Sequence, residues 1–283
     1  MLKQFSLEAL TENTGANKGD SMKAYEIMEK LFTLSYERDY TNTCDTVKAG
    51  DPNVEVNKVA VSMFATPEVV RKAKEWGAEL LIVHEPTYYN HPDVHSDEKI
   101  ENEKRKLIEE SGITLYRYHD HPHFATPDII ATGELKAFDL KGTIEYTDVF
   151  DLVRIHLDEP MTPVELAKRI EEKCGIKHLR ICGARDVKCS VVSGMFGTPG
   201  GEFNELKSDK CEILLVGEAC EWKLGEYARD AAQLGHKKAL IIMGHIGSER
   251  DGMVYTAELI KNFYPELDVK YIECGEVYTY TDS

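Results

Sequence analysis

Residues 59–83, VAVSMFATPEVVRKAKEWGAELLIV, decide the predicted fold. They open with a short apolar run, Val59–Phe64, which is typical of a buried strand. Thr66-Pro67 follows and predicts a helix start, because Thr caps exposed N–H groups and Pro suits the first helical position. The helix should end at Gly77, since glycine accepts the left-handed conformation there. A second apolar run, Leu80–Val83, completes a strand–helix–strand unit.

The same rhythm continues on both sides of this unit. A charged helix is expected from a cap at Ser96 to Ser111-Gly112, and a third strand at Thr114–Tyr118. This order predicts a parallel sheet with right-handed crossovers, and therefore an α/β fold. Upstream, Met22–Phe32 has helical apolar spacing, and the Asp-, Asn- and Thr-rich stretch 39–53 is expected to be a loop.

The second half of the chain has the same character. Thr162-Pro163-Val164-Glu165 is a capping box with Pro inside it, and it begins a helix that should reach Lys173. Helices are also expected at Trp222–Leu234 and Val254–Phe263. The expected strands are Leu152–Leu157, Cys189–Ser193, Ile213–Val216, Ala239–Met243 and Val269–Glu273.

Composition narrows the class of protein. Acidic residues outnumber basic ones by 50 to 34, a net charge of −16, which argues against a nucleic-acid partner because such a partner needs a basic face. The cysteine count, 7, is odd and no pair is spaced as CxxC, so neither a disulfide framework nor a zinc ribbon is expected. No signal-like or membrane-length apolar stretch is present, so we expect a cytoplasmic protein without a membrane partner.

Three polar clusters directly follow predicted buried strands. They are His84-Glu85, the segment His119–His123, and His245 with Glu249. In open α/β sheets, ligands bind at the carboxyl ends of the strands, and parallel neighbours would bring these ends together. Imidazole and carboxylate suit zinc, iron, manganese or nickel, and several of each predict a centre of two divalent transition-metal ions with hydrolytic chemistry.

Other candidate residues have plainer interpretations. His91 and His95 are expected at the surface, and His121 should point away from His119 and His123 if that segment is extended. The stretch Gly194–Gly201 lacks the GK[ST] end of a phosphate-binding loop. It is expected to be a turn or a close backbone contact.

The motifs resemble those of the Nif-three-like family, described as dinuclear metal-centre hexameric proteins and sometimes called GTP cyclohydrolase I type two. Residues 77–86, GAELLIVHEP, match a family run that ends in His-His-Pro, with Glu85 in place of the second His. The segment Tyr116–His123 matches Tyr-x-x-His-x-x-x-Asp, with His123 in place of Asp. Gly244-His245-Ile-Gly-Ser248-Glu249 matches Gly-His-x-x-[ST]-Glu fully, and Gly217-Glu218 is similar to a family position near the site.

The resemblance covers roughly residues 22–280 and implies the metal ligands His84, Glu85, His123, His245 and Glu249, with Glu85 or Glu249 bridging and Asp120 or His119 as further candidates. It also implies two α/β lobes with mainly parallel sheets and the metals in the cleft between them. The first lobe would comprise residues 1–135 and 236–283, and the inserted second lobe residues 136–235. A homohexamer is implied as well.

The leading functional hypothesis is a metal-dependent hydrolase of a small molecule whose identity the sequence does not reveal. Glu218 or Asp120 would shuttle protons in this enzyme. The main alternative is a non-enzymatic metal-binding or metal-insertion factor, or an oligomeric interaction protein. A third is a nucleotide-binding module that uses the loop at Gly194–Gly201.

Overall fold

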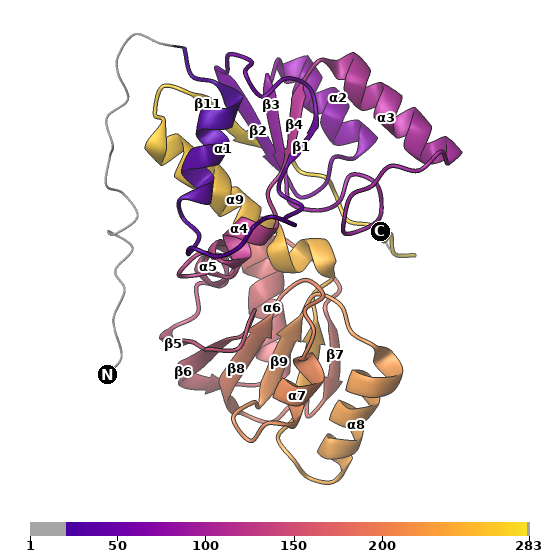
Figure 1. Cartoon of the computed structure of the whole chain (residues 1–283). Helices are drawn as coiled ribbons and strands as arrows, with labels where there is room; N and C mark the ends of the chain where they lie inside the picture. Colours follow the sequence, from indigo (N-terminus) through magenta and orange to yellow (C-terminus); the bar gives the residue numbers. More distant parts are fainter. Residues whose placement is uncertain (1–20, 282–283) are drawn as a thin grey trace. The chain divides into compact units, whose positions relative to one another are not determined.

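The computed structural model describes residues 21–281. By the contacts within it, the chain divides into unit 1 (Met1–Thr126 and Met253–Gly275) and unit 2 (Pro127–Gly252 and Glu276–Ser283). The second division falls within helix α9 (His245–Phe263). Each unit has its own multi-stranded sheet with helices against it, which confirms the predicted α/β class with two parts (Figure 1).

Unit 1 is built on a 5-stranded sheet in the order β1-β4-β3-β2-β11. The pairings among β4, β3, β2 and β11 are parallel, and only the edge strand β1 is antiparallel. Helices α2 and α3 pack on one face through the core that includes Val69, Ile108 and Leu115. The elements are β1 (Val47–Ala49), β2 (Lys58–Ser62), β3 (Leu80–Val83), β4 (Thr114–Arg117), β11 (Asp268–Tyr271), α1 (Ala24–Phe32), α2 (Pro67–Trp76), α3 (Lys99–Ser111) and α4 (Asp120–His123).

The local signals around α2 give the structure that was predicted. Thr66 Oγ1 accepts a hydrogen bond from the Val69 amide at 3.1 Å, and Gly77 ends the helix at φ 82°. The predicted cap of α3 was wrong. Glu98 caps this helix instead of Ser96, because its carboxylate reaches the amides of both Ile100 and Glu101.

Unit 2 is built on a 6-stranded sheet in the order β5-β6-β8-β9-β10-β7. Its central strands β8, β9 and β10 are parallel, and the flanking strands are antiparallel. One face is covered by α5 and α6, and the other by α7, η2 and α8. The elements are β5 (Gly142–Tyr146), β6 (Val153–Met161), β7 (Arg180–Gly183), β8 (Cys189–Met195), β9 (Ile213–Val216), β10 (Ala239–Ile242), α5 (Ile129–Phe138), α6 (Pro163–Cys174), α7 (Glu202–Lys207), the π-helix η2 (Glu221–Gly225) and α8 (Glu226–Gln233).

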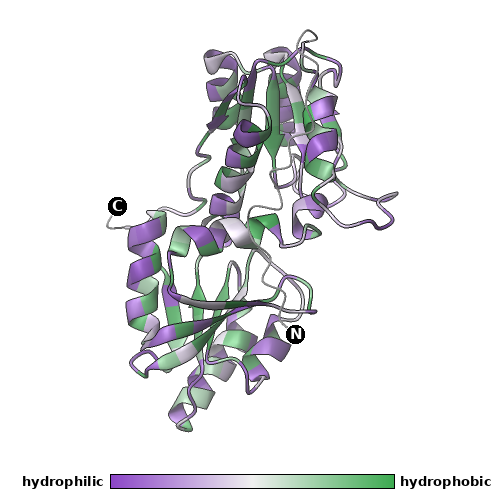
Figure 2. Cartoon of the chain, turned by 90° about the vertical axis from the view of Figure 1, so that its left-hand side faces the viewer, coloured by the Kyte–Doolittle hydropathy of each residue, from purple (hydrophilic) through white to green (hydrophobic). Residues whose placement is uncertain are grey.

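Apolar alternation explains how each helix layer finds its sheet face. In β9 and β10, Ile213, Leu215 and Ile241 point toward α5 and α6. Their neighbours Leu214 and Leu240 point toward α7 and α8. Both faces are therefore buried, and the two strands are apolar throughout, as the hydropathy colouring of Figure 2 shows for the central strands of each sheet.

Strand β10 lies in a different sheet from the one expected. It pairs with β9 and β7, so residues 236–252 belong to unit 2, whereas the sequence placed them in the same lobe as β3 and β4. The expectation that three strand ends share one sheet edge is therefore corrected: β3 and β4 are parallel neighbours in unit 1, and β10 ends in unit 2. Periodicity identifies a strand but not its partners.

The last long helix also begins earlier than expected. Helix α9 begins at His245 instead of Val254. Its first turns include Gly247 and Gly252, and glycine is a poor helix former, so the sequence pattern did not indicate a helix there. The His245-x-x-x-Glu249 motif is therefore on a helix, where residues four apart lie on one face. The predicted helix 222–234 is divided into η2 and α8.

Within unit 2, α5 and the first part of α9 approach each other at two glycines. A Cβ placed on Gly133 would lie 2.5 Å from the Gly252 Cα and would also collide with the Asp251 carbonyl oxygen. A Cβ on Gly252 would lie 2.5 Å from the Ile130 Cα. The backbones can pack this closely only because both residues lack a side chain.

Glu134, on α5, is fully buried beside this crossing, and its Oε1 accepts the Asp251 amide at 2.7 Å. Burial, reinforced by the charge of Asp251, raises its pKa well above 4.5. Because the pKa of Glu134 is higher in the folded than in the unfolded state, its protonated form contributes to the free energy of unfolding. This contribution is complete below pH 4.5, and it is lost as the pH rises through the pKa of the folded state.

We therefore expect Glu134→Gln to increase the free energy of unfolding at pH 8 more than at pH 5, because Gln keeps the acceptor without a buried charge. Urea unfolding at the two pH values measures this. A gain that is no larger at pH 8 would contradict the assignment of a neutral Glu134.

Candidate metal centre

The carboxyl ends of β3 and β4 bring three histidines of unit 1 together. One ligand nitrogen each of His84, His119 and His123 lies within 4.8 Å of the others. His84 and His119 follow adjacent parallel strands, as predicted, and His123 is on the helical turn α4. The ring centroids of His84 and His119 are 4.6 Å apart, and those of His84 and His123 are 5.1 Å apart.

The hydrogen bonds of His84 set its tautomer. Its Nδ1 lies 3.0 Å from the Tyr118 carbonyl oxygen, which can only accept, so Nδ1 carries the proton. Its Nε2 therefore has a lone pair and lies 3.3 Å from the Nε2 of His123. Complete burial lowers the pKa of His84 well below 6.5, and the neighbouring His119 contributes to this shift. A neutral imidazole with a fixed tautomer is suited to bind a metal.

Glu85 is buried directly after His84. The amides of His84 and Glu85 both donate to the Met63 carbonyl oxygen, at 3.1 and 2.9 Å, which fixes the turn at the end of β3. Arg117, fully buried on β4, holds the following loop by donating from Nε to the His84 carbonyl at 3.1 Å and from Nη1 to the His91 carbonyl at 2.6 Å.

His121 points away from the other histidines, as expected, although the segment is a helical turn and not extended. Its ring stacks between those of Phe32 and Tyr40, with centroids 3.9 and 4.0 Å away. Its Nδ1 lies 2.6 Å from Oδ2 of Asp45, which also accepts the His121 amide at 2.8 Å. His121 therefore anchors α4 and is not among the residues that could hold a metal here.

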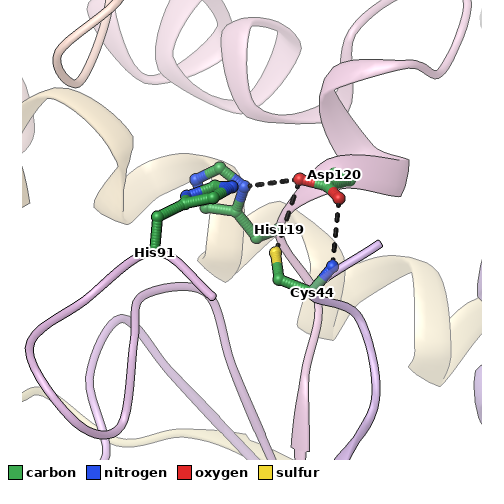
Figure 3. Close-up of side chains that lie close together, drawn as sticks. All are labelled: Cys44, His91, His119 and Asp120. Carbon is green, nitrogen blue, oxygen red and sulfur yellow. Dashed lines mark hydrogen bonds and ion pairs between the residues drawn. The ribbon is translucent and has the colours of Figure 1, made fainter. Parts of the chain in front are cut away.

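A second group of donors lies beside this cluster. Cys44, His91, His119 and Asp120 each offer a ligand atom, and these atoms lie within 4.8 Å of one another (Figure 3). His91 is exposed, as expected from the sequence, but it nevertheless joins this group. Burial acts to raise the pKa of Asp120, but hydrogen bonds from His119 and Thr43 outweigh it and lower the pKa. Asp120 is thus a carboxylate in neutral solution.

In unit 2, the first turn of α9 places His245 and Glu249 side by side. His245 Nε2 lies 3.1 Å from Glu249 Oε2. On the other side of the ring, Nδ1 lies 2.8 Å from Glu218 Oε1 and 3.1 Å from Thr198 Oγ1. Glu218 follows β9 and Thr198 follows β8, so the parallel centre of the sheet positions both partners of His245.

The loop after β8 packs against Glu249. Gly197, at φ 63°, lies so close that a Cβ on it would be 2.8 Å from the Glu249 carboxyl carbon. Its amide donates a hydrogen bond to Ser248 Oγ at 2.9 Å, and its carbonyl oxygen accepts the Glu218 amide at 3.0 Å. The stretch Gly194–Gly201 is therefore a close backbone contact, as predicted, and its glycine shapes the space around Glu249.

Several residues of these sites carried no signal in the sequence. Cys44 and Asp45 are in the stretch that was predicted to be a loop, and each contacts residues more than 70 positions away. Arg117 was interpreted only as part of a strand, and Thr198 only as part of a turn. A pattern of apolar residues indicates where a strand lies, but it does not indicate which residues far apart in the sequence come into contact.

These arrangements define a class: an α/β protein of two units in which histidine and carboxylate groups could hold metal ions. The family follows from comparison with known proteins. Residues 21–276 match the model of the Duf34/NIF3 (NGG1p interacting factor 3) family, and the chain belongs to this family. This confirms the resemblance inferred from the motifs.

Relatives in this family are distant in sequence. The protein named GTP cyclohydrolase 1 type 2 homolog of Clostridium perfringens is 22% identical over 88% of this chain and 94% of its own. The one of Buchnera aphidicola is 24% identical over 77% and 84%. Among solved structures, a Bacillus cereus protein related to NIF3 matches 93% of this chain and 100% of its own with a TM-score of 0.74 at 15% identity. Reduced HcgD from Methanocaldococcus jannaschii matches 90% of this chain and 98% of its own with a TM-score of 0.69 at 17% identity. At such low identity, the similarity to these two structures shows a shared fold.

No helix among residues 21–281 combines the length and the apolar character that crossing a membrane requires.

Proposed function

We propose that the protein is a metal-dependent hydrolase that binds two divalent transition-metal ions. The ligands that we assign are His84, Glu85 and His123 on unit 1, and His245 and Glu249 on unit 2. The observation that carries this proposal is the 3.3 Å between the Nε2 atoms of His84 and His123. Two ligands on one tetrahedral ion, at bonds of about 2.0–2.1 Å, are about 3.3 Å apart.

The surroundings of these residues fit metal ligands. His84 donates its other ring proton to a backbone carbonyl, and Nδ1 of His245 faces the Glu218 carboxylate. Such partners orient a ligating imidazole and raise its basicity. When bound, the ions would supply Lewis acidity toward a substrate carbonyl or phosphoryl group. Imidazole and carboxylate ligands suit zinc, iron, manganese or nickel as the resident metal.

The two candidates for proton transfer differ in their surroundings. The Glu218 side chain is 55% exposed and contacts His245, so it can exchange a proton with solvent and a substrate. Asp120 is held by Thr43, Cys44 and His119, which stabilise its charged form. These contacts favour Glu218 as the proton-transferring group and Asp120 as a ligand or a structural acceptor.

Turnover of a substrate panel by the purified, metal-loaded full-length chain tests the enzymatic part of the proposal. The relatives are named as homologues of a GTP cyclohydrolase, so GTP is the first compound to try, followed by other nucleotides, phosphoesters and amides. Tight metal binding without turnover of any class would support instead a metal-binding or metal-insertion factor.

Replacing His245 by Ala tests the metal-binding part separately. We expect the amount of bound metal to fall sharply while the fold is kept, because His245 is only partly buried at the start of α9. Metal per chain is measured by mass spectrometry after equilibration with limiting metal, and circular dichroism checks the fold. Unchanged metal content in a folded variant would rule out His245 as a ligand.

A further inference from the structure

We propose that Cys44, His91, His119 and Asp120 form a separate zinc-type site in unit 1. These four residues are called the Cys44 cluster below. The proposal is independent of the hydrolase function, and it adds a sulfur ligand that the sequence motifs did not suggest. The four ligand atoms lie within 4.8 Å of one another. A tetrahedral ion with bonds of about 2.0–2.3 Å needs donors about 3.3–3.8 Å apart, so small side-chain rotations would close the site.

The contacts already present show which atoms face the centre of the cluster. Oδ1 of Asp120 lies 3.4 Å from the Cys44 Sγ and 3.1 Å from the His119 Nδ1. The ring centroid of His91 is 5.1 Å from that of His119. Figure 3 shows His91 approaching from its loop on the side opposite Cys44. Sulfur, nitrogen and oxygen therefore converge on one point from separate segments of the chain.

The surrounding structure holds these donors in place. Oδ2 of Asp120 accepts the Thr43 hydroxyl at 2.8 Å and the Cys44 amide at 3.2 Å, which leaves Oδ1 directed at the cluster. The carbonyl of His91 is held by Arg117 at 2.6 Å. Partners of this kind fix the orientation of ligands before a metal binds.

His119 belongs to two groups of neighbouring donors, and its hydrogen bond decides the assignment. Its Nδ1 faces Asp120, whereas His84 and His123 already face each other through their Nε2 atoms at 3.3 Å. We therefore assign His119 to the Cys44 cluster and leave His84 and His123 to the proposed hydrolytic set.

Charge also favours a divalent cation at this point. The Cys44 thiol lies 3.6 Å from Oδ1 of the buried Asp45 and 3.4 Å from Asp120. When Cys44 ligates as a thiolate, it adds a negative charge beside those of Asp45 and Asp120, and a divalent ion at this point neutralises two of the three. A mixture of thiolate, imidazole and carboxylate ligands suits zinc, and four protein ligands are typical of a zinc ion that stabilises structure. The ion would connect the loop of Cys44, the loop of His91 and the end of β4.

Cobalt(II) added to the metal-free full-length protein tests this site directly, because cobalt takes the place of zinc and a cobalt–thiolate bond gives an ultraviolet charge-transfer band. We expect the wild type and His123→Ala to show this band, and one equivalent of zinc at the site to abolish it. Cys44→Ser should lose the band. The control Cys274→Ser, which removes another cysteine of unit 1, should keep it.

His91→Ala is the second variant, since the exposed His91 can be removed with little risk to the fold. We expect it to weaken cobalt binding by at least about 10-fold. Absence of the band in the wild type, or a band that survives in Cys44→Ser, would overturn the proposal. His123→Ala distinguishes the two sites. If this variant binds less metal but keeps the thiolate band, the lost metal belongs to the proposed hydrolytic set and the Cys44 cluster is intact.

Discussion

Gly133→Ala should lower the free energy of unfolding by about 2 kcal/mol, although alanine is normally the better helix former. In an open helix the change would add about 1 kcal/mol of stability. At this position the new Cβ meets the Gly252 Cα at 2.5 Å and the Asp251 carbonyl oxygen, which are backbone atoms that a side-chain rotation cannot move. Forcing α5 away from α9 costs about 3 kcal/mol, the upper end of the range for overpacking, because the obstacle is backbone. This cost exceeds the gain in helix propensity by about 2 kcal/mol.

Gly247→Ala is the matched control on the same helix, α9. Its Cβ would lie 3.5 Å from Ile176 Cδ1, an ordinary contact, so this variant should be as stable as the wild type or about 1 kcal/mol more stable. Urea unfolding of both variants, followed by circular dichroism, gives the comparison. If Gly133→Ala proves as stable as Gly247→Ala, the close approach of the two helices does not exist in solution.

His123→Ala should weaken metal binding at the histidine set of unit 1 by at least about 100-fold, or about 2.7 kcal/mol. The reason is geometric: His123 supplies the nitrogen that faces His84 Nε2 at 3.3 Å, the spacing of two ligands on one ion. Calorimetric titration of the metal-free protein with zinc measures the affinity. The variant should fold, because His123 is only partly buried and alanine favours the helical turn α4.

The control for this variant is His156→Ala in unit 2. His156 is half-exposed and contacts Glu145 at 2.9 Å, outside both proposed ligand sets. It should bind zinc as the wild type does. Equal affinities for the two variants would remove His123 from the ligand set.

The features that could be predicted from sequence are those with local causes. Thr66, Pro67 and Gly77 fixed both ends of α2, because a cap, a ring-constrained φ and a left-handed residue act within a few positions of themselves. The apolar strands β3, β9 and β10 were found for the same reason. The cap of α3 was missed because two nearby residues, Ser96 and Glu98, could both accept amides, and the longer side chain reached two of them.

The features that failed depend on distant partners. The sequence of Ala239–Ile242 does not indicate that this strand pairs with β9 and not with β3. A central position in either sheet would bury both of its faces, and both positions therefore require the same apolar residues. Likewise, His245 and Glu249 were recognised as a motif, but their helical position and the approach of Gly197 depend on a loop about 50 residues upstream. The candidate ligands were thus predictable as residue types, and their mutual geometry was not.

The buried Arg117 constrains how many residues the chain can have between His84 and His91. Its guanidinium donates hydrogen bonds to the carbonyls of both His84 and His91, and these two bonds fix the distance between the two ends of the loop segment 84–91. Tyr89 lies within this segment and Asp93 just after it, and both have a φ of 59°, a left-handed value that few non-glycine residues adopt. An inserted or deleted residue between His84 and His91 would pull one carbonyl away and leave a buried charge without its acceptor. The number of residues between His84 and His91 is therefore constrained, whereas the exposed residues around Ser96 lie beyond the two carbonyls that Arg117 bonds.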